Sequence, residues 1–172
     1  DCTIIDPSRS PELIDQYGKL YYEKRQRKGL TLHQAVKKMR QRTYFGAMMV
    51  ELGQADAFIS GQNSNYPDTI RPALEIIGKT DGVTKVAGMY IIMSKQGPLF
   101  FADTTVNIAP TSDELVDIVK LTHRMVTNLQ IKPRIAMLSY SNFGSAKGTT
   151  PSNIRTALAK LNRENPEILV DG

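Results

Sequence analysis

The sequence has little cysteine, histidine and tryptophan, and these shortages limit the kinds of site that it can build. Cys2 is the only cysteine, His33 and His123 are the only histidines, and tryptophan is absent. One cysteine cannot close an internal disulfide, and two separated histidines do not make a zinc-binding cluster. We therefore expect neither a disulfide framework nor a metal site in this chain.

Long apolar runs are missing as well. No stretch approaches the ~20 apolar residues that a membrane-spanning helix needs. The composition, 41% hydrophobic and 23% charged, is that of an ordinary soluble domain. We expect a cytoplasmic protein with no membrane partner. Because "TIID" resembles the end of a strand and "EILVDG" stops on another, we also expect a piece truncated at both ends.

Positive charge is concentrated in one segment. The formal net charge is +5, and the segment 19–42 holds nine basic residues against the single acid Glu23. This stretch is typical either of solvated helix faces or of a surface that meets phosphate. Aromatic residues make up only 7% of the chain and do not alternate with the basic ones, so we expect no nucleic-acid partner.

Residues 1–54 predict a helical entry segment with a basic face. Ser10 followed by Pro11 is typical of a helix start. Thr31 and Gln34 have the spacing of a capping box for a second helix, and a further helical pattern runs to Gly53.

Residues 55–172 predict an α/β core. Short apolar runs at 55–60 and 134–140 predict buried strands, and "KVAGMYIIMS" with "GPLFFADTTVN" predicts an antiparallel hairpin that follows a turn at "TDGV". Helices are expected at 69–77, at 111–129, where Thr111 and Glu114 have the spacing of a second capping box, and from Pro151 onwards. In the first of these, Asp68 is the expected N-cap, so Arg71 and Pro72 would lie in the first turn. The expected architecture is a mixed, mostly parallel sheet with helices on both faces.

Small polar residues follow three of the expected strands. They are Ser60 and Gly61 after the first, Asp103, Thr104, Thr105 and Asn107 after the second, and Ser139, Ser141, Asn142, Gly144 and Ser145 after the third. In open α/β sheets ligands bind at the carboxyl ends of strands, and hydroxyls, amides and glycine N–H groups suit an anion. Each strand end alone is also compatible with an ordinary turn, and Asp103 with an acid that caps a neighbouring loop.

Four ordered motifs, "GQADAFISG", "DTIRPALEIIG", "GPLFFADTTVNIAPTSDELVDI" and "IKPRIAMLSYSNFGS", resemble the phosphate acetyl/butyryltransferase family over nearly the whole chain. "GMYIIM" and "SYSNFGS" are most similar to the C-terminal transacetylase-like domain of bacterial NADP-dependent malic enzymes. The resemblance implies a phosphotransacetylase-like fold of the isocitrate and isopropylmalate dehydrogenase type, with a cleft for coenzyme A and acyl phosphate.

The resemblance also implies roles for individual residues. Arg71 matches an arginine near the acyl phosphate, and the polar residues after the strands match cleft motifs. The family's Ser-Arg pair, thought to carry catalysis, lies beyond Gly172, so no catalytic residue is expected in this chain. Asn142 and Phe143 replace the Thr-Lys of the plain transferases, which removes a cation beside the phosphate.

Two functions follow from the resemblance. The first is a regulatory domain that binds acetyl-CoA and supports a homo-oligomer, a dimer or larger. Its parent would oxidise malate to pyruvate, with NADP and a divalent metal in an absent N-terminal part. The alternative is an active phosphate acetyltransferase. In both cases the expected partner is a coenzyme A thioester or an acyl phosphate.

Overall fold

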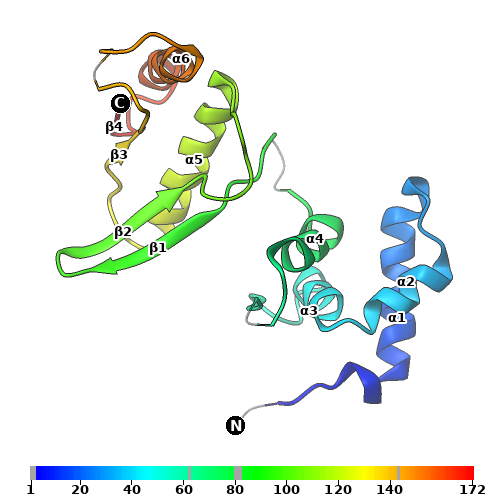
Figure 1. The fold of residues 1–172 in the computed structure, drawn as a ribbon. Helices are drawn as coiled ribbons and strands as arrows, with labels where there is room; N and C mark the ends of the chain where they lie inside the picture. The colour runs from blue at the N-terminus through cyan, green and yellow to red at the C-terminus, as the bar shows by residue number, and fades with distance from the viewer. Residues whose placement is uncertain (1–2, 62, 80–82, 143) are drawn as a thin grey trace. The chain divides into compact units, whose positions relative to one another are not determined.

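The computed structural model describes residues 3–61, 63–79, 83–142 and 144–172, which form two compact units, residues 1–79 and 80–172. The two are described separately (Figure 1). Cys2, most of the expected turn at "TDGV" and Phe143 lie outside the described residues.

The first unit is helical. Its α-helices are α1 (Pro11–Arg25), α2 (Leu32–Met39), α3 (Arg42–Glu51) and α4 (Tyr66–Ile76), and short 3-10 turns, η1 (Pro7–Arg9) and η2 (Gln26–Lys28), precede and follow α1. The expected start of α1 at Pro11 is confirmed. The capping box of α2 is confirmed too, because Thr31 Oγ1 accepts from the Gln34 N–H and Gln34 Oε1 accepts from the Thr31 N–H.

The core of this unit lies between α1, α2, α3 and α4. It contains Ile14, Tyr17, Tyr21, Ala35, Met39, Tyr44, Phe45, Ala47, Met48 and Ile76. The helices approach closely at Gly18 of α1, where an added Cβ would lie 2.6 Å from Val36 Cγ2 of α2. Met39 and Met48 are therefore part of a tightly packed interior.

The expected strand at 55–60 is not formed. A strand needs a neighbour to pair with, and the described residues of the first unit contain no strand. Phe58 packs instead on α3, where an added Cβ on Gly46 would lie 2.4 Å from the Phe58 ring, while Ile59 is 95% exposed. The apolar run alone could not distinguish a sheet strand from a segment anchored by one aromatic side chain.

Helix α4 begins earlier than expected. Its N-cap is Asn65 and a proline, Pro67, lies in its first two positions, so Asp68 belongs to the first turn. Arg71 and Pro72 consequently lie in the second turn, and the prediction that they lie in the first is wrong. Pro72 cannot donate to the carbonyl four residues back, but its ring is fully buried, and that burial offsets the missing bond.

The second unit contains the predicted hairpin. Strand β1 (Met89–Ser94) pairs antiparallel with β2 (Gly97–Ala102), in a register that runs from Met89 opposite Ala102 to Ser94 opposite Gly97. A second pair is parallel and only two residues long, β3 (Ile135–Ala136) with β4 (Val170–Asp171). The described residues thus form two small sheets in place of the expected mixed sheet. The strand expected at 134–140 shortens because β4 pairs with only two of its residues.

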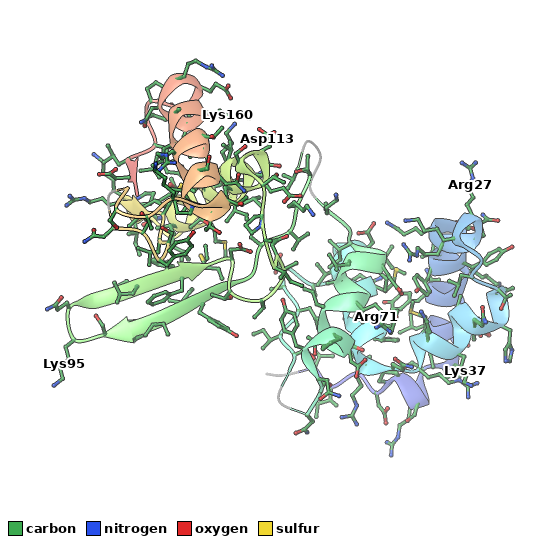
Figure 2. The ribbon with its side chains drawn as sticks, turned by 45° about the horizontal axis from the view of Figure 1, so that its top comes forward. Arg27, Lys37, Arg71, Lys95, Asp113 and Lys160 are labelled. Atoms are coloured by element: carbon green, nitrogen blue, oxygen red, sulfur yellow. The ribbon has the colours of Figure 1, made fainter. Side chains whose placement is uncertain are left out.

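Two helices complete the second unit, α5 (Ser112–Asn128) and α6 (Thr149–Glu164). The capping box of Thr111 and Glu114 that opens α5 is confirmed. Both helices contribute to a small core of Val116, Val119, Ala157, Leu161 and Ile168. Figure 2 labels Lys160 of α6 and Asp113 of α5, which form an ion pair.

Candidate functional site

The residues expected to bind ligand are divided between the two units. Ser60, Gly61 and Arg71 belong to the first unit, and the loops 103–107 and 139–145 belong to the second. The expectation that Ser60, Thr104 and Ser141 line one hollow therefore stays a prediction.

The loop after β2 is held by Asp103. This residue has a left-handed backbone, with φ of 59°, and its N–H donates to the Gly88 carbonyl at 2.9 Å. Asn107 Nδ2 donates to Asp103 Oδ1 at 2.8 Å and to the Val86 carbonyl at 3.1 Å. Asp103 and Asn107 thus support each other and the loop, which agrees with the reading of Asp103 as a loop-capping acid. A left-handed non-glycine residue costs about 1–3 kcal/mol and is most often kept where a site needs that geometry.

Thr104 is the residue of this loop whose contacts are incomplete. Its Oγ1 is buried and has no hydrogen-bond partner among the described residues. A buried hydroxyl without a partner costs free energy, and native proteins usually satisfy such groups with protein atoms, water or ligand. Among the described residues, Thr104 Oγ1 therefore keeps an unused hydrogen-bonding capacity.

Serine hydroxyls hold the loop after β3. Ser139 Oγ accepts from the Ser141 N–H at 3.0 Å, and Ser141 Oγ accepts from the Ala146 N–H at 3.1 Å. Ser145 Oγ accepts from the Asn142 N–H at 3.0 Å. Gly144 has a φ of 80°, which favours glycine at this position. These serines hold the described residues on both sides of position 143 through hydrogen bonds within the loop.

Arg71 lies on a pocket of the first unit. The pocket has a volume of about 470 Å³, and Lys38, Arg42, Ser64 and Asp68 also line it. Ser60 and Gly61 are exposed and lie outside this lining. The structure therefore places Arg71 with basic residues of α2 and α3, which the sequence motifs did not indicate.

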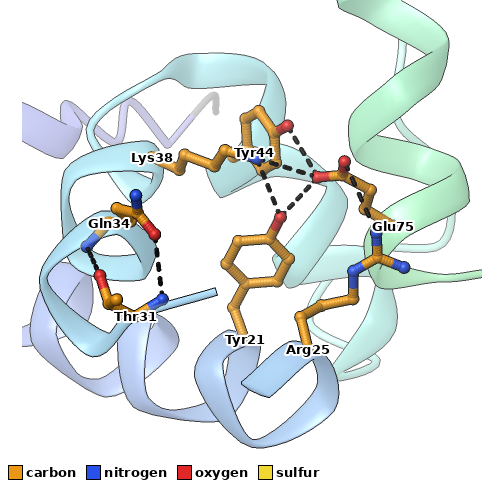
Figure 3. A network of polar contacts seen from close by, with 7 residues as sticks. All are labelled: Tyr21, Arg25, Thr31, Gln34, Lys38, Tyr44 and Glu75. Atoms are coloured by element: carbon orange, nitrogen blue, oxygen red, sulfur yellow. Dashed lines mark hydrogen bonds and ion pairs between the residues drawn. The ribbon is translucent and has the colours of Figure 1, made fainter. Parts of the chain in front are cut away.

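A polar network inside the first unit was also missed by sequence reasoning. Glu75 accepts hydrogen bonds from the hydroxyls of Tyr21 and Tyr44 and from Lys38 Nζ, and it pairs with Arg25 at 3.7 Å (Figure 3). Lys38 Nζ also lies 4.9 Å from the centre of the Tyr44 ring. The contributing residues come from α1, α2, α3 and α4, so the network joins all four helices.

Burial and these contacts shift the ionisation of the network. Burial alone would raise the pKa of Glu75, but the hydrogen bonds from Tyr21, Tyr44 and Lys38 outweigh it and hold the pKa below its usual value of 4.5. Burial, with the nearby carboxylate, raises the pKa of Tyr21 and of Tyr44. Glu75 is therefore ionised and both tyrosines are neutral donors at neutral pH.

The basic stretch 19–42 is partly neutralised. Lys24 pairs with Glu51, and Arg25 and Lys38 share Glu75. A second pocket of about 420 Å³ is lined by basic residues of the same stretch, Arg25, Lys28, Lys37 and Lys38. The segment thus supplies both internal ion pairs and an electropositive surface, and the two readings drawn from the sequence are not exclusive.

The described part of the chain contains no group of three or more His, Cys, Asp or Glu residues arranged to hold a metal ion. Within the same residues, no helix has the length and apolar character required to cross a bilayer.

Comparison with known proteins identifies the family. The model of the family described as phosphate acetyl/butaryl transferase matches residues 1–172. The chain belongs to this family. A phosphotransacetylase from Streptococcus pyogenes, of known crystal structure, has the same fold, with a TM-score of 0.81 and 35% identity over 92% of this chain and 49% of that one. The resemblance and the phosphotransacetylase-like fold inferred from the sequence are confirmed at this level.

Relatives of two kinds are similar to this transferase-family chain. It is 35% identical to the phosphate acetyltransferase of Clostridium acetobutylicum, over 98% of this chain and 53% of that protein. It is 34% identical to the NADP-dependent malic enzyme of Escherichia coli, over 100% of this chain and 23% of that protein. The chain spans about half or less of the length of these relatives, and the malic enzymes are not singled out by identity.

Proposed function

We propose that this chain is a coenzyme A thioester-binding regulatory domain, the C-terminal module of an NADP-dependent malic enzyme. In this proposal acetyl-CoA is an effector, and the parent protein, a homo-oligomer, carries the NADP and metal chemistry in another part. Malate oxidation would belong to that part alone.

The observation that carries the regulatory reading is the charge of the loop after β3. Its segment "SYSNFGS" at 139–145 includes no cation, and its serine hydroxyls and N–H groups bond one another. Transfer of an acyl group to phosphate requires positive charge where negative charge develops. The absence of a cation from 139–145 supports ligand recognition more strongly than chemistry.

Two features support recognition of a phosphate-bearing ligand. Arg71 lies on an electropositive pocket, and an arginine can make two charge-assisted bonds to one phosphate. Thr104 has a buried hydroxyl without a partner among the described residues. We propose that both contact the coenzyme A thioester or its phosphate, together with the residues at 60–61, 105–107 and 139–145.

Regulation requires more than binding. An effector changes a distant active site only if it binds one arrangement of the protein better than another. We propose that acetyl-CoA has this preference because its contacts come from separate segments of the chain. The preference would appear as a change in malate oxidation by the full-length parent.

A second candidate function is phosphate acetyl transfer. Similarity to the phosphate acetyltransferase of Clostridium acetobutylicum, at 35% identity, favours it as much as similarity to the malic enzyme favours the regulatory reading. The protein's contribution would then be to position the thiol against the acyl carbonyl and to neutralise phosphate.

One experiment distinguishes the two. The full-length parent is assayed for acetyl phosphate formation from acetyl-CoA and phosphate, and for malate oxidation with and without acetyl-CoA. Acetyl-CoA binding and altered malate oxidation without transfer would support the regulatory domain. Transfer at ordinary enzyme rates would overturn it in favour of the acetyltransferase.

Arg71→Ala tests the contact with phosphate. We expect it to weaken binding of acetyl-CoA to the full-length parent by about 1.5–3 kcal/mol, the size of a lost charge-assisted hydrogen bond. Arg27→Ala is the matched control, because Arg27 is exposed and lines neither pocket (Figure 2). If calorimetry gives equal affinities for the two variants, Arg71 is a surface residue of α4 that does not contact the ligand.

A further inference from the structure

The Arg71 pocket contains a second arginine, Arg42, that no family motif indicates. Arg42 is the first residue of α3, and Arg71 lies in the second turn of α4. Both line the same cavity of about 470 Å³. The cavity lies entirely within the first unit, so its lining does not depend on how the two units are placed.

The charges around this cavity do not balance. Lys38, Arg42 and Arg71 face it with Asp68 as the one acid in its lining. Lys38 is held by Glu75, at 3.2 Å, but within the described residues neither arginine forms a salt bridge. Two guanidinium groups beside one cavity make it a place where an anion is stabilised.

Asp6 is an acid outside the cavity lining that interacts with Arg42 through its charge. Its pKa is lowered mainly by hydrogen bonds from Ser8, with smaller contributions from the charges of Arg9 and Arg42. Asp6 is itself bonded to Ser8 and pairs with Arg9 at 3.7 Å. It therefore leaves Arg42 available to a ligand.

The helix ends around the cavity add to the same potential. Its lining includes the first residues of α3, and both α3 and α4 begin without a side-chain capping bond. In contrast, α2 and α5 each begin with a complete capping box. Uncapped N–H groups carry partial positive charge, which supplements the two arginines.

We propose that Arg42 is a second phosphate-binding residue, which acts with Arg71 on one dianionic phosphate group of the ligand. This inference rests on the proposed function for the ligand's identity, while the pocket itself rests on the residues above. Asp68 has the opposite role, since its carboxylate repels the same group. The phosphate can be that of an acyl phosphate or the phosphomonoester of coenzyme A.

The test titrates the 172-residue chain with inorganic phosphate, coenzyme A and dephospho-coenzyme A at constant ionic strength, by calorimetry or by chemical shift. We expect Arg42→Gln to weaken phosphate and coenzyme A binding roughly tenfold, as loss of a charge-assisted contact would. Asp68→Asn should tighten binding about threefold, because a repulsive charge is removed. Arg40→Gln makes the same change in net charge, is exposed, lines neither pocket, and should change affinity less than twofold.

The source of the phosphate follows from the three ligands. If Arg42→Gln weakens the binding of coenzyme A but not that of dephospho-coenzyme A, the bound group is the phosphomonoester of coenzyme A. If the variant leaves coenzyme A binding unchanged and weakens the binding of inorganic phosphate, the bound group is the transferable phosphate.

The proposal is overturned if Arg42→Gln has no larger effect than Arg40→Gln, or if the wild-type chain binds none of the three ligands. Arg42 is exposed, and unchanged thermal unfolding checks that its variant is folded. If Arg71→Ala weakens acetyl-CoA binding and Arg42→Gln does not, this inference is refuted while the proposed function is not.

Discussion

The two units of this chain bury their apolar residues to different extents. The first unit encloses a core of ten residues between four helices, with Met39, Ala35, Ala47 and Met48 at 0% exposure. Among the described residues, the second unit has a five-residue core formed by α5, α6 and Ile168, with Ile118, Val126 and Ile154 also buried, and its hairpin leaves large apolar side chains exposed, Tyr90, Ile91, Met93 and Leu99 among them. Neighbouring helices can bury their apolar faces against each other, whereas a two-stranded hairpin cannot bury the apolar side chains on its own two faces.

A pair of methionine substitutions gives the largest expected effect. Met48→Ala should lower the free energy of unfolding by about 2–5 kcal/mol, because it opens a cavity in the first core. Met93→Ala, at a side chain that is 76% exposed, should cost less than about 0.5 kcal/mol. Urea denaturation followed by circular dichroism measures both. Equal costs would mean that the hairpin is as well packed as the helices.

Glu75→Gln tests the network that joins the helices of the first unit. Removing the charge weakens bonds to Tyr21, Tyr44 and Lys38, and we expect a loss of about 1.5–3 kcal/mol at neutral pH. Because the pKa of Glu75 is lower in the folded state, its contribution is complete above pH 4.5 and is lost as the pH falls through the folded value.

The pH dependence provides the control for this variant. The difference in stability between the wild type and Glu75→Gln should shrink as the pH is lowered below about 4.5. Denaturant midpoints over a pH series measure it. A difference that is constant with pH would show that Glu75 acts by its shape and not by its charge.

A further, smaller loss is expected at a capping box, a motif that both units contain, so it allows a direct comparison of the two. Thr31→Ala in the first unit and Thr111→Ala in the second each remove a capping bond. Each should cost about 1 kcal/mol. Hydrogen exchange in the first turns of α2 and α5 measures the loss locally. If only one helix start is affected, the two boxes are not equivalent despite their matching geometry.

Local signals explain how much of this fold was predictable. Pro11, the two capping boxes and the hairpin turn each act within a few residues of sequence, and all four features appear where expected. The segment 55–60 and the strand at 134–140 depended on partners elsewhere in the chain, which an apolar run does not specify. For α4, Asn65 and Pro67 mark the start. Asp68 was the expected N-cap because it would place Pro72 in the first turn, where proline is tolerated.

The candidate site was predictable only in part, because sequence motifs are local and the residues around the site come from several helices. Arg71 was named from a motif, but the basic residues that share its pocket, Lys38 and Arg42, come from α2 and α3, and no spacing rule relates them to Arg71. The Glu75 network joins four helices by contacts between residues 17 to 54 positions apart, so it is visible only after folding. The serines at 139–145 were named for a ligand, and the structure gives them a further role inside their own loop.

The central claim is that one coenzyme A thioester contacts separate polar segments of this chain. Hydrogen exchange of the full-length parent, with and without acetyl-CoA, tests it most directly. We predict that acetyl-CoA slows exchange in the segments 60–71, 103–107 and 139–145 together, by a similar factor and over the same range of ligand concentration. Protection confined to one of the three segments, or absent from all of them at saturating acetyl-CoA, would contradict the claim.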